Sequence, residues 1–453
     1  MTCRFSASLS SSDEAENMRL AFPTDPVYTP PPFCVSSAEP PMSLRPYCGI
    51  DFGTSNSAVS VGRGDQVQLV PVEGDAVTLP SALFFNTEED HLSFGRKAIA
   101  EYLDGYEGRL MRALKSVLGS HLIGETTQVG TKRKNFREII GLYIAHVKQA
   151  AERHAGEPIE DVVLGRPVHF VDDDEEANQR AENELRGIAE AQGFKTIRFE
   201  YEPLAAARDY ASRLSARETV LVVDIGGGTS DFSVLSLSPD HSDILANTGV
   251  HIGGTDFDRL LSMDTAMVDM GWKSKLKSGL DMPGLTYHQL STWHLINFLY
   301  TQKVMHSVRE LHHLAERRDL TQRLIKVLED RMGHAIASRI EAAKIALSSD
   351  AVTHIDYGDI DAGWVSDVRR ETLITATARE VARVVATALL CVEKAGLKPD
   401  AIHTLFMTGG STAMPGFEAA MQAAFPAASI NYGDRFSSVA SGLGLAARAA
   451  FKT

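Results

Sequence analysis

The chain has 453 residues, of which 44% are hydrophobic and 23% charged, the composition of a soluble globular protein long enough for two or more cores. Its formal net charge of −14 repels phosphate backbones and anionic lipids, which argues against a nucleic-acid or membrane-surface partner. The four cysteines show no CxxC spacing, so neither a disulfide framework nor a zinc site is indicated. No apolar run approaches the roughly 20 residues that span a bilayer, so no membrane span is indicated either. A cytoplasmic location is therefore expected.

Residues 1–44 differ from the rest of the chain in composition. They are rich in serine, proline and acidic residues and contain too little apolar surface to offset the entropy cost of ordering. We therefore predict a disordered N-terminal extension. Met42 stands just ahead of the first strand pattern and is an alternative translation start, in which case residues 1–41 would not be translated.

After the extension, three segments share one design, a short apolar strand followed by glycine and hydroxyl residues. They read CGIDFGTSNS (48–57), VLVVDIGGGTSD (220–231) and LFMTGGST (405–412). In the first two, the alternation typical of a strand resumes directly after the glycines, which predicts a strand, a tight turn and a second strand. Because these two hairpins lie about 170 residues apart, the sequence predicts two similar half-molecules.

The segments between these turns have helical character. Apolar residues recur every three or four positions from 320 to 349, which predicts a helix with one buried face. Strands that alternate with helices in this way indicate an α/β fold with layered packing.

The glycine turns have the chemistry of a phosphate site. Without a Cβ atom, a turn can bring its backbone N–H groups against a phosphate, and neighbouring hydroxyls add further donors. The chain has neither a P-loop sequence nor a GxGxxG that opens a helix, so two hairpins clamping a polyphosphate from opposite sides is the favoured interpretation. Asp51 and Asp224 end their strands where carboxylates can hold the water shell of Mg²⁺, and Asp231 can orient an attacking water. For either turn alone, an ordinary hairpin with a capping aspartate is an equally good interpretation.

Taken together, these motifs resemble a known family. The order DFGTSNS, DIGGGTSD and MTGGSTAMPGF is similar to the phosphate-1, phosphate-2 and adenosine motifs of the actin-like ATPase superfamily. GRPV (165–168) with YEPLAAA (201–207), HIGGTDFD (251–258) and EAAKIALSS (341–349) look like signatures of the 70-kilodalton heat-shock family. The resemblance covers nearly everything from about residue 45 to residue 453, and within the family it is greatest to a truncated bacterial form.

The resemblance implies an α/β fold with two lobes, the actin-like ATPase fold built from duplicated ribonuclease H-like domains, with a helical insertion in each lobe. The implied boundaries are 45–218 for the first lobe (insertion at about 80–160), 219–436 for the second (insertion at about 256–340) and 437–453 for a C-terminal helix that packs back on the first lobe. The chain stops at Thr453 without the family's peptide-binding β-sandwich. We therefore expect that it does not bind unfolded peptides in the way that this sandwich does.

The resemblance also implies ligands and residue roles. The ligands are ATP or ADP with Mg²⁺, the metal being held through water by Asp51 and Asp224. Lys115 corresponds to the lysine that positions the attacking water, and Glu202 to the carboxylate that reaches the water shell of the metal. The implied catalytic residues are Lys115, Glu202, Asp224, Thr229 and Asp231. The implied nucleotide-binding residues are Gly53, Thr54, Ser55, Asn56, Gly226, Gly227, Gly228, Thr229, Gly254, Glu341, Lys344, Ser348, Gly409, Gly410 and Ser411.

The chain departs from the family at the adenine. The family stacks adenine between two arginines, whereas Ile345 and Ala413 occupy those positions here. Each missing cation–π contact is worth roughly 0.5–2 kcal/mol. The departure predicts weaker ATP binding or relaxed selectivity for the base.

The functional hypothesis is therefore a chaperone-like protein in which slow, Mg²⁺-dependent ATP hydrolysis drives closure of the lobes, and a protein partner such as a co-chaperone reads the closed state. One alternative is a nucleotide-sensing regulator without significant hydrolysis, which the missing arginines favour. Another alternative is a small-molecule kinase, because sugar kinases have the same two lobes and glycine turns. A filament-forming cytoskeletal homologue is a weaker alternative.

Overall fold

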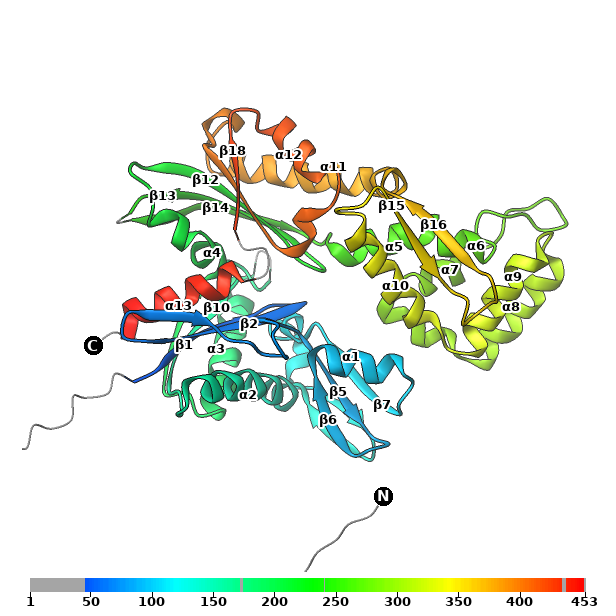
Figure 1. Ribbon diagram of the computed structural model, residues 1–453, viewed down its shortest axis with the longest axis horizontal. Coiled ribbons are helices and arrows are strands. Elements are labelled where there is room, and N and C mark those ends of the chain that lie inside the picture. Colours follow the sequence, from blue (N-terminus) through cyan, green and yellow to red (C-terminus); the bar gives the residue numbers. More distant parts are fainter. Residues whose placement is uncertain (1–44, 172–173, 240, 434–436, 452–453) are drawn as a thin grey trace, which may run out of the picture. The chain divides into compact units, whose positions relative to one another are not determined.

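The computed structural model describes residues 45–171, 174–239, 241–433 and 437–451, so the extension predicted at residues 1–44 lies outside the described residues. The described part is a mixed α/β protein (Figure 1). The arrangement of its sheets and helices determines where the glycine turns lie.

The first sheet joins an antiparallel hairpin to two parallel strands. Its strand order is β11-β10-β1-β2-β3, with β4 also paired to β2. β1 runs antiparallel to β2 and parallel to β10, which in turn runs parallel to β11. The strands are β1 (Tyr47–Phe52), β2 (Asn56–Arg63), β3 (Gln66–Leu69), β4 (Thr78–Pro80), β10 (Asp161–Arg166) and β11 (Thr196–Tyr201).

The second sheet has the same plan. Its strand order is β14-β13-β12-β17-β18, with antiparallel pairing from β14 to β12 and parallel pairing from β12 to β18. Its strands are β12 (Glu218–Ile225), β13 (Ser230–Leu237), β14 (Ser242–Val250), β17 (Thr404–Thr408) and β18 (Ser429–Tyr432). In each sheet the first hairpin is therefore followed by two parallel strands, and the glycine turn links the two strands of that hairpin.

Each sheet is buried by helices that its own segment supplies. α2 (Phe136–Ala155) and α3 (Glu175–Ala191) share a hydrophobic core with the first sheet. The Asn135 side chain caps the start of α2 by accepting a hydrogen bond from the Glu138 N–H, and Gly156 ends the helix in the left-handed conformation. The second sheet shares its core with the helices that follow β14 and with α11 (Arg370–Lys394) and α12 (Phe417–Ala424).

A third hydrophobic core contains residues from both sheets. It is built around α4 (Glu202–Ala211) and α13 (Ser438–Phe451), together with Tyr47 of β1 and Phe406 of β17. The packing is close: a Cβ atom at Gly442 would lie 1.8 Å from the carbonyl oxygen of Ala205. Only glycine allows α13 to approach α4 this closely, so a side chain there would force the helices apart.

The region from 80 to 160, which the resemblance implies to be a helical insertion, is not purely helical. It contains a sheet of order β6-β5-β7 and a β8–β9 hairpin beside α1. β5 is buried at all of its positions, as expected of a strand with neighbours on both faces. The elements are β5 (Ala82–Asn86), β6 (His91–Phe94), α1 (Gly95–Leu103), β7 (Gly108–Arg112), the 3₁₀ turns η1 (Leu114–Val117) and η2 (His121–Gly124), β8 (Thr126–Val129) and β9 (Lys132–Asn135).

The region from about 256 to 340, which the resemblance implies to be a second insertion, is mainly helical, and the helix predicted from 320 to 349 is split in two. α9 ends at Glu329 and α10 begins at Gly333, because Arg331 adopts a left-handed backbone with φ of 56°. The apolar residues of that stretch are largely buried in both helices, as predicted. The elements of this region are α5 (Gly254–Asp264), α6 (Ala266–Asp269), α7 (Leu285–Leu290), η3 (Trp293–Leu299), α8 (Gln302–Leu314), α9 (Arg318–Glu329) and α10 (Gly333–Ala346). They are followed by the hairpin of β15 (Val352–Asp356) and β16 (Val365–Arg369), and the short turns η4 (Pro399–Ala401) and η5 (Gly410–Ala413) follow α11.

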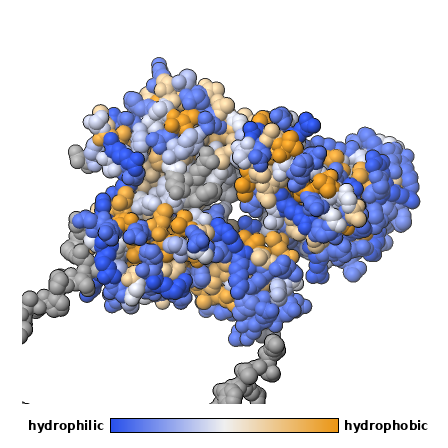
Figure 2. Space-filling view, viewed as in Figure 1, coloured by the Kyte–Doolittle hydropathy of each residue, from blue (hydrophilic) through white to orange (hydrophobic). Residues whose placement is uncertain are grey.

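The surface drawn in Figure 2 is largely hydrophilic, with separate hydrophobic patches. The large hydrophobic side chains with the greatest exposure, 67–70%, are Leu280, Leu285 and Phe298, all in the second insertion. Among the described residues, no helix combines the length and the apolar character needed to cross a membrane.

Candidate functional site

The first glycine turn lies between β1 and β2, at the carboxyl end of β1. Asp51 and Phe52 end the strand, and Gly53 to Ser55 form the turn before β2 begins at Asn56. A Cβ atom at Gly53 would lie 2.2 Å from the carbonyl oxygen of Asn56. No residue other than glycine can therefore occupy this position without changing the shape of the turn.

The second glycine turn, between β12 and β13, is held by two neighbouring segments. Gly226 donates to the Thr229 carbonyl at 3.0 Å, and the Gly226 carbonyl accepts from the Gly254 N–H at 3.0 Å and from the Ser411 hydroxyl at 3.2 Å. The Gly227 carbonyl accepts from the Thr255 N–H at 2.7 Å. The start of α5 and the third glycine segment therefore fix the shape of this turn, and Gly254 and Ser411 lie directly beside it.

The two turns contact each other. A Cβ atom at Gly227 would lie 2.1 Å from the hydroxyl oxygen of Ser55. Gly409, in the third segment, has a φ of 81°, and a Cβ atom there would lie 2.5 Å from Oδ1 of Asp224. The three glycine segments predicted from the sequence are therefore neighbours in space.

Beside the turns lies a cluster of charged residues. Lys115 of η1 is buried and forms an ion pair of 2.5 Å with Glu202, the first residue of α4. The pKa of Asp51 is raised to about 8, first by burial and then by the Glu202 carboxylate, against the lowering effect of Lys115. The pKa of Asp224 is raised to about 7, first by burial and then by Asp231 and Glu202. These mutual effects place all five residues in one cluster.

The cluster has more negative than positive charge. The single ammonium group of Lys115 faces four carboxylates. Burial alone would lower the pKa of Lys115, but the carboxylates of Glu202 and Asp51 outweigh burial and raise it. Such an excess of acidic oxygens suits a divalent cation. Across the described part of the chain, no three His, Cys, Asp or Glu side chains converge closely enough to chelate a metal ion directly. Asp51 and Asp224, the two residues predicted to hold Mg²⁺ through water, both belong to this cluster.

Thr229 and Asp231 follow the second turn. The Thr229 hydroxyl donates to Oδ2 of Asp231 at 2.9 Å, and Asp231 pairs with Asp224 across the hairpin. The hydroxyl and the carboxylate predicted to orient water are thus held together at the edge of the turn.

The predicted adenosine residues are only partly brought together. Lys344 of α10 donates to the Gly254 carbonyl at 3.1 Å and forms an ion pair of 2.8 Å with Asp258 of α5. Glu341 lies on α10 and Ser348 lies just beyond its end at Ala346. Both are exposed, and their side chains form no hydrogen bond or ion pair with any other described residue. Ile345, an apolar residue predicted to lie at the adenine, is 61% exposed.

Sequence reasoning missed two residues of this region, Asp258 and Arg112. The Asp258 side chain is 17% exposed, and its pKa is raised to about 6, mainly by burial. The HIGGTDFD motif contains Asp258, so the signal was present, but the partnership with Lys344 depends on helix packing. Arg112 ends β7 with its guanidinium 4.5 Å above the Trp293 ring, and burial lowers its pKa while Glu341 and Asp258 raise it.

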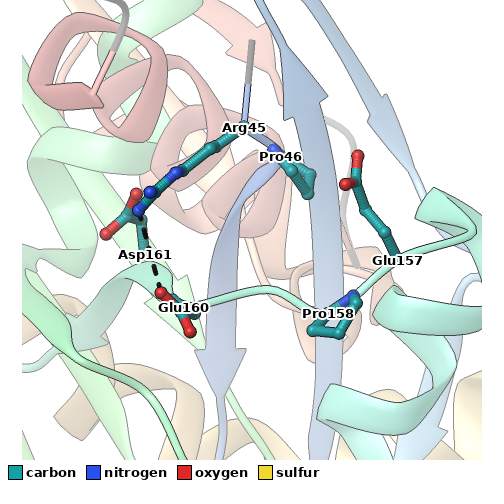
Figure 3. Close-up of a pocket in the computed structure, with 6 residues that line it drawn as sticks. All are labelled: Arg45, Pro46, Glu157, Pro158, Glu160 and Asp161. Atoms are coloured by element: carbon teal, nitrogen blue, oxygen red, sulfur yellow. Dashed lines mark ion pairs between the residues drawn. The ribbon is translucent and has the colours of Figure 1, made fainter. Parts of the chain in front are cut away.

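A separate hollow of about 230 Å³ lies elsewhere (Figure 3). It is lined by Arg45, Pro46, Glu157, Pro158, Glu160 and Asp161, and Arg45 is 3.8 Å from Glu160. The register pairs Tyr47 with Asp161, so this hollow is at the amino end of β1, whereas the glycine turn is at its carboxyl end. Ligands of such sheets bind at the carboxyl ends of the strands, which favours the glycine turns as the functional site.

Comparison with known protein families decides the classification. The family model described as Hsp70 protein matches residues 47–277 and 309–448. The chain belongs to the Hsp70 family. Hsp70 proteins are ATP-binding chaperones related to the actin-like ATPases, and they bind nucleotide, typically with Mg²⁺. Every candidate site residue named above lies within the matched ranges, whereas residues 278–308, which include Leu280, Leu285 and Phe298, lie outside them.

Proposed function

We propose that this Hsp70-family protein binds Mg·ATP between its two glycine turns and hydrolyses it slowly. The observation that supports this most is the contact between the turns, which is so close that a side chain at Gly227 would collide with Ser55. The acidic cluster beside the turns supports it as well. Each turn follows an aspartate at the end of a strand, so both present backbone N–H groups beside carboxylates.

In this proposal the residues of the chain bind, orient and exclude water. The N–H groups of the turns bind the phosphates, and Mg²⁺ when bound neutralises part of their charge. Lys115, fixed by Glu202, positions the water that attacks the terminal phosphate, and Thr229 with Asp231 orients it. Most of any rate gain would come from donors that are already in place before the reaction.

The finer architecture is also a proposal. We place the first lobe at 45–218, the second at 219–436 and a C-terminal helix at 437–453, as the shared strand order of the two sheets suggests. α13 lies against α4 and β1, which fits a helix that packs back on the first lobe. The resemblance to truncated bacterial members of the family is part of the same proposal.

Closure of the lobes is supported by contacts between the two insertions. The Tyr102 hydroxyl of α1 is 3.3 Å from Nδ1 of His334 and accepts from the Asn297 amide at 3.1 Å. His334 Nε2 donates to the Trp293 carbonyl at 3.1 Å, which leaves Nδ1 to accept from Tyr102 in the neutral tautomer. We infer that this group of four residues helps to keep the insertions together over the nucleotide, and that a protein partner responds to their separation.

Replacing Tyr102 with phenylalanine tests this contact. The variant keeps the ring but loses the hydrogen bonds to His334 and Asn297, each worth about 1 kcal/mol. We expect ATP to dissociate roughly tenfold faster, as measured by stopped-flow release of a fluorescent ATP analogue. Tyr106→Phe is the matched control, since its hydroxyl has no hydrogen bond to another described residue. Equal release rates in the wild type and Y102F would contradict the inference.

The same contact predicts a pH effect on stability. The pKa of His334 is lowered to about 4, first by burial and also by Arg112, against the raising effect of the Trp293 carbonyl. The unfolded chain takes up this proton near pH 6.5, whereas the folded protein does not until about pH 4, so stability falls as the pH falls through that window.

We expect the free energy of unfolding to fall by about 2 kcal/mol more in the wild type than in His334→Gln between pH 7 and pH 4.5. Urea denaturation at both pH values measures the difference. His354→Gln, at an exposed histidine, is the control and should follow the wild type. A wild type and an H334Q variant with the same pH dependence would rule out a neutral, buried His334.

A nucleotide-sensing regulator without significant hydrolysis is the second candidate. It is favoured by Ile345 and Ala413, which replace the adenine-stacking arginines and predict weaker binding or relaxed base selectivity. Calorimetric titration with ATP and GTP in Mg²⁺, followed by a single-turnover assay, separates the candidates. Binding with turnover supports the ATPase, binding without turnover supports the sensor, and no nucleotide binding at all would end both.

A further inference from the structure

Ser81, between β4 and β5, lies directly behind the first glycine turn. It is only 2% exposed. Its hydroxyl donates to the Gly53 carbonyl at 2.6 Å, and its backbone N–H donates to the Ser55 carbonyl at 2.8 Å. The Ser57 hydroxyl is 2.9 Å from the same Ser81 oxygen and can donate to it. One residue thus supplies hydrogen bonds to two carbonyls of the turn, those of Gly53 and Ser55.

The position of Ser81 is itself fixed by the core. The Tyr143 hydroxyl of α2 donates to the carbonyl of Pro80, the residue before Ser81, at 3.0 Å. Tyr143 is fully buried, and burial raises its pKa, so its hydroxyl stays a donor. Tyr143 and Ser81 are buried, whereas Pro80 and the turn itself are partly buried. Hydrogen bonds shielded from water in this way are costly to lose.

These hydrogen bonds orient the groups that would meet a phosphate. A peptide unit is planar, so holding the Gly53 carbonyl also fixes the direction of the Thr54 N–H, and holding the Ser55 carbonyl fixes that of the Asn56 N–H. Both residues are among the predicted nucleotide-binding positions. In the second turn, the carbonyls of Gly226 and Gly227 are held by Gly254, Thr255 and Ser411. Nothing in the sequence motifs supplied such a partner for the first turn.

We propose that Ser81 is a positioning residue for phosphate recognition, which holds the first glycine turn in the shape that presents the Thr54 and Asn56 N–H groups to the polyphosphate. The proposal rests on the proposed function, because it assigns Ser81 to the same nucleotide site. Ser81 acts through the turn and touches no part of the nucleotide itself. Its effect must therefore depend on the phosphates and not on the adenosine.

Ser81→Ala tests the proposal because it removes the hydroxyl and adds no bulk. Losing a buried hydrogen bond to the turn should weaken ATP binding roughly tenfold. Adenosine, which has no phosphate, should bind S81A within about twofold of the wild type. ATP affinity is measured by calorimetric titration in Mg²⁺, and adenosine affinity by its competition with ATP.

Ser60→Ala is the matched control. Ser60 of β2 is also fully buried, and its hydroxyl donates to a carbonyl, that of Ala440 in α13, at 2.7 Å. S60A should lower the melting temperature but leave the ratio of ATP to adenosine affinity unchanged. This ratio is insensitive to a general loss of stability, which both variants share.

The outcomes are distinguishable. A selective loss of ATP affinity in S81A supports the proposal. Equal losses for ATP and adenosine, or no loss of ATP affinity, overturn it while leaving the nucleotide site intact. A wild-type protein that binds neither ligand overturns the proposed function itself, and with it the role of Ser81.

Discussion

Replacing Lys115 with methionine should lower the single-turnover rate of ATP hydrolysis by about 100-fold or more while ATP still binds. Removing one pre-positioned donor to developing charge typically costs roughly 100- to 1,000-fold in rate. Lys115 is the only basic residue shown to influence both Asp51 and Asp224 in the described cluster, and its ion pair with Glu202 fixes its ammonium group. Methionine keeps the length and the apolar stem of the side chain, so the local packing should survive.

The control for this experiment is another buried lysine. Lys148 of α2 has a similar exposure and a similar ion pair of 2.5 Å, in its case with Glu152, but it lies away from the glycine turns. K148M should lose stability and keep its turnover. If K115M hydrolyses ATP at the rate of the wild type, Lys115 has no role in positioning water. If K148M and K115M lose activity equally, the activity of K115M is lost because the variant folds poorly.

Replacing Asp224 with asparagine should have two effects of opposite sign. Hydrolysis and the Mg²⁺ dependence of ATP binding should be lost, by about 100-fold in rate, because the water shell of the metal loses a carboxylate. The nucleotide-free protein should become more stable, by about 1–2 kcal/mol at pH 7.5, because a buried negative charge beside Asp231 and Glu202 is removed. A melting curve and a turnover assay on the same preparation measure both.

The sign of the stability effect follows from the pKa. The unfolded chain releases the Asp224 proton near pH 4, whereas the folded protein keeps it until about pH 7, so the stability that Asp224 contributes is lost as the pH rises through that window. Asparagine has no such proton, and the gain of D224N should shrink toward pH 4.

Asp269→Asn is the control for charge removal outside the site. Asp269 accepts from Trp364 Nε1 at 3.1 Å and from Ser366, so its carboxylate is used in packing. This variant should be less stable and should keep its response to Mg²⁺. A D224N protein that is destabilised, or that keeps Mg²⁺-dependent turnover, would contradict the acidic cluster as a metal site.

The parts of the fold that the sequence predicts best are those specified by neighbouring residues. The turns at Gly53 and Gly226–Gly228 were predictable because strand alternation resumes directly after the glycines, and both hairpins have this register. The buried stripe of α9 and α10 was predictable for the same reason. The break at Arg331 was not predicted, although Gly333 lies two residues further on, because the left-handed backbone falls on Arg331 and not on the glycine.

The parts of the site that escaped prediction depend on contacts between distant segments. Ser81 and Gly53 are 28 residues apart, and Tyr102 and His334 are 232 residues apart. Neither pair leaves a periodic pattern, because a single hydrogen bond across a fold constrains two positions without constraining their neighbours. Lys115 was placed in the site only through the family resemblance, and its ion pair with Glu202 supplies the physical reason for its position.

A crystal structure with Mg²⁺ and a non-hydrolysable ATP analogue tests most directly whether the two turns bind the phosphates of one nucleotide. We predict phosphate density in hydrogen-bond reach of the backbone N–H groups in both turns, at residues 53–56 and 226–229, with the metal joined to Asp51 and Asp224 through water. Nucleotide bound at any other place, or phosphates that contact only one turn, would contradict it.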